Sequence, residues 1–221
     1  MKKVSNESRF DRQQSLQDND TRKTLKVCVV GAWGIGSNSC YCLAKQWIEN
    51  IKCVDFDKVE IENTGSQFYT EKHIWKYKVE ALQEQVLEQT WVKIDIVKQK
   101  YKKSNIKGYD VIVLALDNLE TRKAIVEDAD DNQIILDTRM VKRISQCFSF
   151  YGFQKDRWFE ECYTTDENTI QEVACTEKAI AHNALIMAWI VGSLVCDVCN
   201  NKPLPRKIQC DMSNYILSYN R

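Results

Sequence analysis

The chain has 221 residues, of which 44% are hydrophobic, and this length is enough to bury the core of one α/β domain. Lysine and arginine together number 31, and aspartate and glutamate also number 31, so the formal net charge is zero. A chain without net positive charge lacks the field that drives sequence-independent binding to nucleic acid, and we expect no nucleic-acid partner.

The first segment, residues 1–24, is predicted to be an N-terminal arm. It begins with two lysines but contains no apolar stretch and no small-residue cleavage site, so it is not typical of a secretory signal. We therefore expect a cytoplasmic protein.

Strands and helices are predicted to alternate over residues 25–150. The strand at 111–116 is wholly apolar, as expected for a central strand covered on both faces. The pattern predicts a Rossmann-like α/β fold with a mostly parallel sheet, helices on both faces and ligands at the carboxyl edge. The predicted elements, in chain order, are strand 25–30, helix 37–47, strand 51–55, an irregular polar stretch 57–70, helix 75–88, strand 92–97, strand 111–116, helix 119–129, strand 134–136 and an antiparallel strand 144–150.

The C-terminal part is predicted to complete the same domain. Residues 151–175 show no clear periodicity, which predicts a long crossover or active-site loop, and 176–221 are predicted to be a helix and tail, with antiparallel strand added near this part. The apolar run 179–195 falls just short of a membrane span and contains His182 and Asn183. We therefore expect a buried helix and no membrane partner.

Ten cysteines are present, and most are predicted to be reduced. Cys196 and Cys199 form one CxxC pair, but a structural zinc site normally needs a second pair, so we do not expect zinc. Four cysteines lie within apolar strand or helix patterns, where a free thiol behaves as a small hydrophobic side chain. They are Cys28, Cys40, Cys42 and Cys53.

A glycine turn lies between the first strand and the first long helix. Gly31, Gly34 and Gly36 are placed where backbone N–H groups and the helix dipole can bind a phosphate. Trp33 occupies the position where a dinucleotide fingerprint requires glycine, which argues against NAD or FAD. Asp55 ends the second strand, where an acid can bind ribose hydroxyls; a simple turn aspartate is the structural alternative.

Asp117 directly follows the apolar strand 111–116, at the sheet edge where ligands collect. Helix capping is its structural alternative. Both roles are compatible, because either Asp117 or Asn118 can cap the next helix while the other meets a ligand.

Several motifs follow one another along residues 9 to 200, and their order and spacing are hard to obtain by chance. The motifs are Arg12-Gln13, the glycine turn with Ser37, Val54-Asp55-Phe56-Asp57, Glu62-Asn63, Gln67-Phe68, Lys78, Asp117-Asn118 with Arg122, and Cys175-Thr176-Glu177. This ordered series resembles the ThiF/MoeB family, the bacterial relatives of ubiquitin-activating enzymes.

The resemblance implies ATP-dependent adenylylation of the C-terminal glycine carboxylate of a ubiquitin-like or sulfur-carrier protein. Negative charge must be neutralised on both sides of the α-phosphorus in this reaction, so cations and Mg²⁺ must converge there. The implied nucleotide-binding residues are Gly31, Gly34, Gly36, Asp55, Asp57, Asn63, Gln67, Lys78, Asp117, Asn118 and Arg122. Among them, Asp55 would bind ribose, Asn63, Gln67 and Lys78 would line the phosphates, and Asp117 would hold Mg²⁺.

The implied catalytic residues are Arg12, Lys78, Asp117 and Cys175. In the family, the arginine matching Arg12 reaches the nucleotide of the neighbouring subunit, which implies a homodimer. Cys175 opens the last long helix and is either a nucleophile that receives the activated carboxylate or sulfur, or a structural thiol. For Lys78 and Arg122 the structural alternative is an exposed helix face.

Two positions depart from the family pattern. Ser66 replaces an arginine that contacts phosphates, and Trp33 replaces a glycine. We predict that Arg139, which follows a strand at the same sheet edge, supplies the missing cation. Two other functions remain open: a catalytically weakened relative that binds nucleotide or a partner, and a nicotinamide- or flavin-dependent oxidoreductase.

Overall fold

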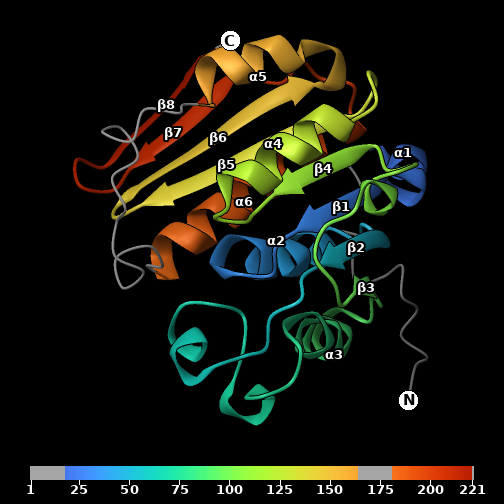
Figure 1. The fold of residues 1–221 in the computed structure, drawn as a ribbon, viewed down its shortest axis with the longest axis vertical. Helices are drawn as coiled ribbons and strands as arrows, with labels where there is room; N and C mark the ends of the chain where they lie inside the picture. Colours follow the sequence, from blue (N-terminus) through green and yellow to red (C-terminus); the bar gives the residue numbers. More distant parts are fainter. Residues whose placement is uncertain (1–17, 164–180, 221) are drawn as a thin grey trace.

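The computed structural model describes residues 18–163 and 181–220, and within them the protein is built around one eight-stranded sheet. The strand order is β3-β2-β1-β4-β5-β6-β7-β8 (Figure 1). The strands are β1 Lys26–Val30, β2 Asn50–Val54, β3 Asp95–Val97, β4 Val111–Leu114, β5 Ile134–Val141, β6 Ile144–Tyr151, β7 Lys207–Asp211 and β8 Ile216–Asn220.

The first five strands in the sheet order are parallel, and the last three add antiparallel pairs. Val30, the last residue of β1, pairs with Val54 on one side and with Leu114 on the other. The carboxyl ends of β1, β2 and β4 therefore meet at one edge of the sheet. The predicted mostly parallel α/β sheet with added antiparallel strands is confirmed.

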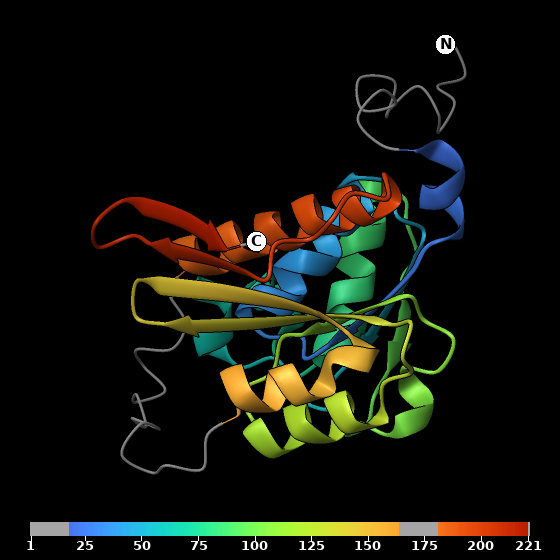
Figure 2. The same ribbon diagram turned by 90° about the horizontal axis from the view of Figure 1, so that it is seen from above.

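Helices cover both faces of the sheet, as predicted (Figure 2). One core cluster joins the sheet to α2, α3 and α6, and a second joins it to α4 and α5. The α-helices are α1 Asn19–Thr24, α2 Gly34–Lys45, α3 Lys78–Thr90, α4 Leu119–Asp128, α5 Lys155–Glu161 and α6 Ala181–Cys199. Short 3-10 helices are η2 Ile61–Gly65, η3 Glu71–His73, η4 Lys103–Asn105 and η5 Gly152–Gln154.

Helix α6 is the one helix in the described residues that is long and apolar enough to cross a membrane, with a mean hydropathy of 1.5. It packs along α2, and side chains such as Asn183, Met187 and Val191 are fully buried. Gly192 allows close packing, because a Cβ there would lie 2.8 Å from the Cys42 sulfur of α2. The prediction of a buried helix is confirmed for this face of α6, whereas Leu185 and Trp189 on the same helix are exposed.

The predicted cysteine burial is confirmed for Cys28, Cys40 and Cys53, whereas Cys42 is half-buried. Burial raises the pKa of Cys28 to about 12, so this thiol stays protonated at neutral pH. Nine cysteines lie in the described part of the chain, and all nine are free thiols.

The prediction of a long loop after residue 150 is wrong for its first part. Residues 152–161 form η5 and α5, and the buried Trp158 attaches α5 to the sheet. The remainder of that segment, 164–180, lies outside the described residues. The predicted tail also contains the β7–β8 hairpin, and β5 extends to Val141, well beyond the predicted end at 136.

Candidate active site

A cavity of about 650 Å³ lies at the carboxyl ends of β1, β2 and β4. This is the edge at which parallel α/β sheets bind ligands. Its volume is within the usual range for small-molecule sites, roughly 300–1,000 Å³. The lining residues are Val30, Gly31, Trp33, Val54, Asp55, Phe56, Asp57, Gln99, Lys100, Tyr101, Leu116, Asp117, Asn118, Glu120, Thr121 and Ala124.

The glycine turn brings the backbone close to two neighbouring elements. Gly31 has φ +98°, in the left-handed region, and a Cβ there would overlap the Ala115 carbonyl group after β4. A Cβ at Gly36 would overlap the carbonyl oxygen of Gly31. Gly31 lines the cavity, whereas Gly34 and Gly36 do not, and the predicted role of the three glycines at a phosphate stays a prediction.

Asp55 fixes the turn through both oxygens of its carboxylate. Oδ2 accepts a hydrogen bond from the Ala32 N–H, and Oδ1 accepts one from the Asp57 N–H, each at 2.7 Å. Tyr69 donates its hydroxyl to the Ala32 carbonyl at 2.6 Å. Burial raises the pKa of Asp55, and the two backbone N–H groups and Lys78 oppose this rise. Each carboxylate oxygen has two lone pairs, so Asp55 can still accept hydrogen bonds from a ligand.

Lys78 is buried beneath Trp33. The Lys78 ammonium lies 4.0 Å from the centre of the indole ring and 3.4 Å from Asp57 Oδ2. The Trp33 Nε1–H donates to the same Asp57 oxygen at 3.1 Å. Lys78 begins α3, and its side chain is only 3% exposed, so the exposed-helix alternative is wrong for this residue. The lysine contacts two lining residues without lining the cavity itself.

Asn118 caps helix α4, and Asp117 is the residue available to a ligand, as the two roles considered for this pair allow. The Asn118 side chain caps α4 by accepting the Thr121 N–H at 2.7 Å. Asp117 lines the cavity and is exposed. Asp117 therefore does not cap α4, and its carboxylate faces the cavity.

Arg122 lies in a buried network behind the cavity. Its guanidinium donates to the carbonyl groups of Leu114, Leu116 and Thr138 and pairs with the Asp137 carboxylate. It is 7% exposed, so the exposed-helix alternative is wrong for Arg122 as well. Arg122 does not line the cavity, and its bonds hold the end of β4 in place.

The network is completed from β5 and α5. Arg139 contacts Asp137 Oδ2 at 2.8 Å, and the Trp158 Nε1–H donates to the same oxygen at 2.7 Å. Burial alone would raise the pKa of Asp137, but the charges of Arg122 and Arg139 and the hydrogen bonds of Arg139 and Trp158 hold it below its usual value. Arg139 is paired with Asp137 and does not line the cavity, so its role at the nucleotide stays a prediction.

Asn63 and Gln67 are not among the cavity-lining residues. Asn63 Oδ1 accepts the Glu60 N–H within a capping box of η2. Gln67 is buried, and its Oε1 has no hydrogen-bond partner among the described residues. Ser66 lies on the same segment, and its carbonyl oxygen would be 3.7 Å from a Cβ at Gly34. The structure therefore places this segment beside the start of α2.

Some lining residues were missed by the sequence reasoning. Gln99, Lys100 and Tyr101 follow β3, and Lys100 Nζ lies 5.4 Å from the centre of the exposed Phe56 ring. The rule that ligands meet the carboxyl ends of parallel strands would have identified them, since strand 92–97 was predicted. Asp137, which belongs to the buried Arg122 network and does not line the cavity, was also missed, because a charged residue within a strand gives no ligand signal by itself.

Two predicted catalytic residues, Arg12 and Cys175, lie outside the described residues. Cys199 is buried, which raises its pKa to about 11, and Cys196 is half-buried. Within 18–163 and 181–220, no group of three or more histidine, cysteine, aspartate or glutamate side chains is arranged to hold a metal ion.

Comparisons with known proteins agree with this architecture. A model of the ThiF family matches residues 10–216. Over 127 residues, 52% of this chain and 29% of the relative, the chain is 33% identical to the adenylyltransferase and sulfurtransferase MOCS3 of Aedes aegypti. Alignments with the curated relatives cover between 17% and 44% of those proteins, so the chain spans less than half of their length.

Two solved structures share the fold at low sequence identity. PaaA superposes with a TM-score of 0.76 at 20% identity, covering 100% of this chain and 85% of that protein. Escherichia coli MccB, in a crystal structure with ATP, superposes with a TM-score of 0.74 at 16% identity, covering 96% of this chain and 71% of that protein.

Proposed function

Because the chain belongs to the ThiF family, we propose that it uses ATP to adenylylate the C-terminal glycine carboxylate of a ubiquitin-like or sulfur-carrier protein. The observation that carries the proposal is the cavity at the ends of β1, β2 and β4, where Asp55, Asp57 and Asp117 converge. The relative MOCS3 is named an adenylyltransferase, and the fold neighbour MccB was crystallised with ATP; both facts support the proposal.

The residues of the cavity fit a nucleotide. Asp55 is fixed by two backbone N–H groups and has lone pairs left for ribose hydroxyls. The exposed ring of Phe56 offers an apolar face for a base. Helix α2 starts at Gly34 beside Trp33, and no side chain caps this end, so its N–H groups and dipole favour a phosphate.

The cavity charge favours a nucleotide that carries a metal ion. Four carboxylates line the cavity, and Lys100 is the one lysine or arginine among the lining residues. A bare triphosphate would be repelled by these carboxylates, whereas Mg²⁺ uses one or two carboxylates together with phosphate oxygens. We propose that Asp117 is the Mg²⁺ ligand, because its carboxylate is exposed and does not cap α4.

Each side chain has a proposed part in the transfer. ATP would supply the α-phosphorus, which the partner's carboxylate attacks while pyrophosphate leaves. Asp55 would orient the ribose, and Lys78 would exchange Asp57 for a phosphate once Trp33 moves aside. Arg122 would act indirectly, by holding the carbonyl groups of Leu114 and Leu116 in place at the end of β4.

Three further features belong to the proposal. The protein would work as a cytoplasmic homodimer, with Arg12 of one protomer reaching the nucleotide of the other. Exposed apolar side chains on α6 and β8, including Trp189 and Leu217, support an association between copies. Cys175 would either receive the activated carboxylate or remain a structural thiol.

A second function is favoured by a specific observation. Trp33 covers Lys78, and Ser66 stands where the family has an arginine, so the chain could bind nucleotide or partner without turnover. An oxidoreductase is not proposed, because Trp33 lines the cavity at the position where the pyrophosphate of a dinucleotide must approach a glycine backbone closely.

Exchange between ATP and labelled pyrophosphate separates the two functions. We expect exchange when ubiquitin or a sulfur-carrier protein ending in Gly-Gly is added, and none when both C-terminal glycines of the carrier are deleted. The Asp117→Asn variant should lose the exchange. ATP binding without exchange in the presence of both carriers would favour the function without turnover.

A further inference from the structure

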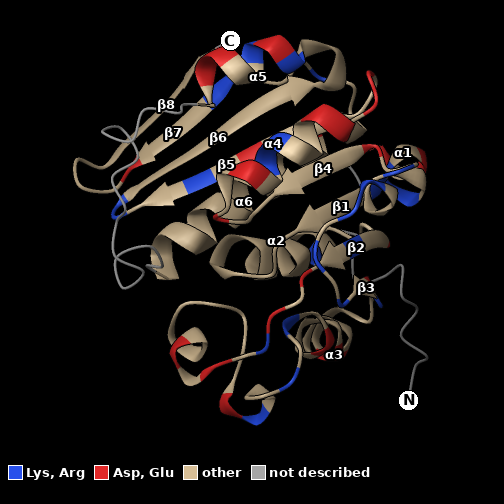
Figure 3. Ribbon diagram, viewed as in Figure 1, with Lys and Arg blue, Asp and Glu red and all other residues tan. Residues whose placement is uncertain are grey.

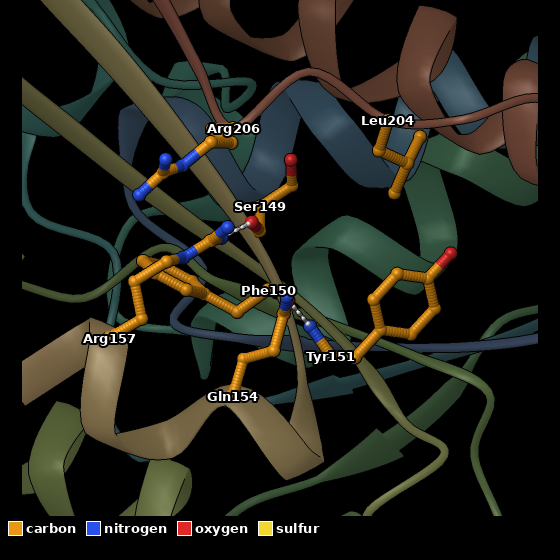
Figure 4. A pocket seen from close by; sticks show the side chains of 7 residues that line it. All are labelled: Ser149, Phe150, Tyr151, Gln154, Arg157, Leu204 and Arg206. Atoms are coloured by element: carbon orange, nitrogen blue, oxygen red, sulfur yellow. Dashed lines mark hydrogen bonds between the residues drawn. The ribbon is translucent and has the colours of Figure 1, made fainter. Parts of the chain in front are cut away.

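A second cavity, of about 480 Å³, lies at the opposite edge of the sheet, where β6 ends beside the start of β5. Helix α5 and the segment 203–206 before β7 form its walls (Figure 4). Its lining shares no residue with the cavity at the carboxyl edge. The lining residues are Ser149, Phe150, Tyr151, Gln154, Arg157, Leu204 and Arg206.

Two arginines give this cavity a positive charge. Both contact the same oxygen of Glu161: Arg206 through Nη2, and Arg157 through Nε at 3.9 Å. One carboxylate therefore serves two guanidinium groups. Burial lowers the pKa of Arg157, and the charge of Arg206 lowers it further, while Glu161 opposes both effects. A second negative charge in the cavity would reduce the repulsion between the guanidinium groups of Arg157 and Arg206.

The arginines are held in different ways. Arg157 donates to the Ser149 carbonyl and lies 4.4 Å from the centre of the Phe150 ring, and its side chain is 18% exposed. Arg206 is 51% exposed, with its Nη2 on Glu161. Arg157 is thus fixed against β6, and Arg206 is the more accessible of the two donors.

The other lining side chains give the cavity an apolar side. In Figure 4, Arg157 and Arg206 lie on one side, and the rings and methyl groups of Tyr151 and Leu204 lie on the other. Gln154 Oε1 accepts the Tyr151 N–H at 3.0 Å, so its amide nitrogen is left as a donor. The cavity therefore combines cationic donors with an apolar wall.

We propose that this cavity binds a small molecule that joins one carboxylate or phosphate group to an aromatic or other apolar body. The anionic group contacts Arg206 and Arg157, and the apolar body packs against Leu204 and Tyr151. Guanidinium groups bind carboxylate and phosphate by charge-assisted hydrogen bonds, which are stronger than neutral ones. The site shares no lining residue with the nucleotide cavity, so its occupant is a ligand distinct from the nucleotide.

Isothermal titration calorimetry of the full chain tests this site. The probes are benzoate, phenyl phosphate, acetate and inorganic phosphate, each titrated with saturating ATP and Mg²⁺ present. We expect saturable binding of benzoate or phenyl phosphate, and the tighter of the two identifies the preferred anionic group. Acetate and inorganic phosphate should bind more weakly, because they cannot fill the apolar side.

Three variants connect the binding to this cavity. Arg206→Gln should weaken the aromatic anion about tenfold. Arg143→Gln, which changes an arginine at the other end of β6, is the matched control and should bind normally. Leu204→Ala should weaken the aromatic anions but not inorganic phosphate, and it supplies the test if Arg206→Gln does not fold.

Absence of saturable binding by both aromatic probes at millimolar concentration would overturn the proposal. Unchanged affinity in the folded Arg206→Gln variant, or probe binding that is seen without ATP and lost at saturating ATP, would also overturn it. None of these results bears on pyrophosphate exchange, so this site can fail while the proposed adenylylation stands.

Discussion

The Lys78 ammonium lies 4.0 Å from the centre of the Trp33 ring, so the lysine expected to meet phosphate is covered by an indole. Both side chains also contact Asp57 Oδ2. This arrangement keeps the positive charge paired while no anion is bound. It makes Trp33 the residue whose removal most directly changes access to Lys78.

Trp33→Gly should bind ATP about threefold more tightly, or better, because it frees the Lys78 ammonium for phosphate. Loss of the cation–π contact should at the same time lower folding stability by about 0.5–2 kcal/mol. Calorimetric titration with ATP and Mg²⁺, together with urea unfolding, measures both effects. Trp75→Gly, which removes a tryptophan that is 74% exposed, is the control for ATP binding; it is no control for stability, because Trp75 has φ +72°, where glycine is itself favourable. Weaker ATP binding by Trp33→Gly would show that the indole itself holds the nucleotide.

Asp55→Asn should abolish measurable ATP binding, because the amide cannot accept from both the Ala32 and Asp57 N–H groups. One backbone donor would be left unpaired, at a cost of about 1–3 kcal/mol in stability. Asp110→Asn is the matched control, since Asp110 also accepts a backbone N–H, that of Lys26, at the opposite edge. If Asp55→Asn bound ATP as the parent does, the ribose role of Asp55 would be wrong.

ATP affinity should depend strongly on Mg²⁺. Four carboxylates and one lysine line the cavity, so removing the metal with a chelator should weaken ATP binding about tenfold or more. Asp117→Asn should lose most of this dependence on Mg²⁺, whereas Asp156→Asn, on the exposed side of α5, should retain it. Equal affinities with and without Mg²⁺ in the parent chain would contradict the assignment.

Asp137 should make the stability of the protein sensitive to acid. Its folded pKa is held below the unfolded value of about 3.9, so its ion pairs contribute fully above that pH and are lost as the pH falls through the folded pKa. Asp137→Asn should cost about 3–5 kcal/mol near neutral pH, because Arg122 is left buried beside an uncharged group. Urea unfolding of both forms between pH 7 and pH 3 should show this difference shrinking below pH 4. A difference that stays constant with pH would contradict the ionised network.

The sequence predicts the elements whose burial follows from their own residues. Val111–Leu114 is apolar throughout, and its neighbour β1 is apolar after Lys26, so strand type and sheet position could be predicted. Helix α5 could not, because its sequence is dominated by charged residues and only Trp158 is buried (Figure 3). Strand β8 is exposed along its whole length, and it forms because it pairs with β7. No local sequence pattern indicates this pairing.

The sequence also predicts part of the candidate site, namely the residues that follow apolar strands. Asp55 and Asp117 could be placed at the cavity because each directly follows an apolar strand. The burial of Lys78 and Arg122 could not be predicted, since a charged residue on a helix is normally exposed and only tertiary partners reverse this. The pairing of Arg139 with Asp137 likewise depends on β5 extending beyond its apolar start.

The central claim is that ATP binds at the carboxyl ends of β1, β2 and β4. A crystal structure of the full chain with a non-hydrolysable ATP analogue and Mg²⁺ tests it most directly. We expect the ribose against Asp55, the metal ion on Asp117, and Lys78 turned from Asp57 toward a phosphate. A nucleotide bound elsewhere, with Asp55 and Asp117 making no contact to it, would contradict the account.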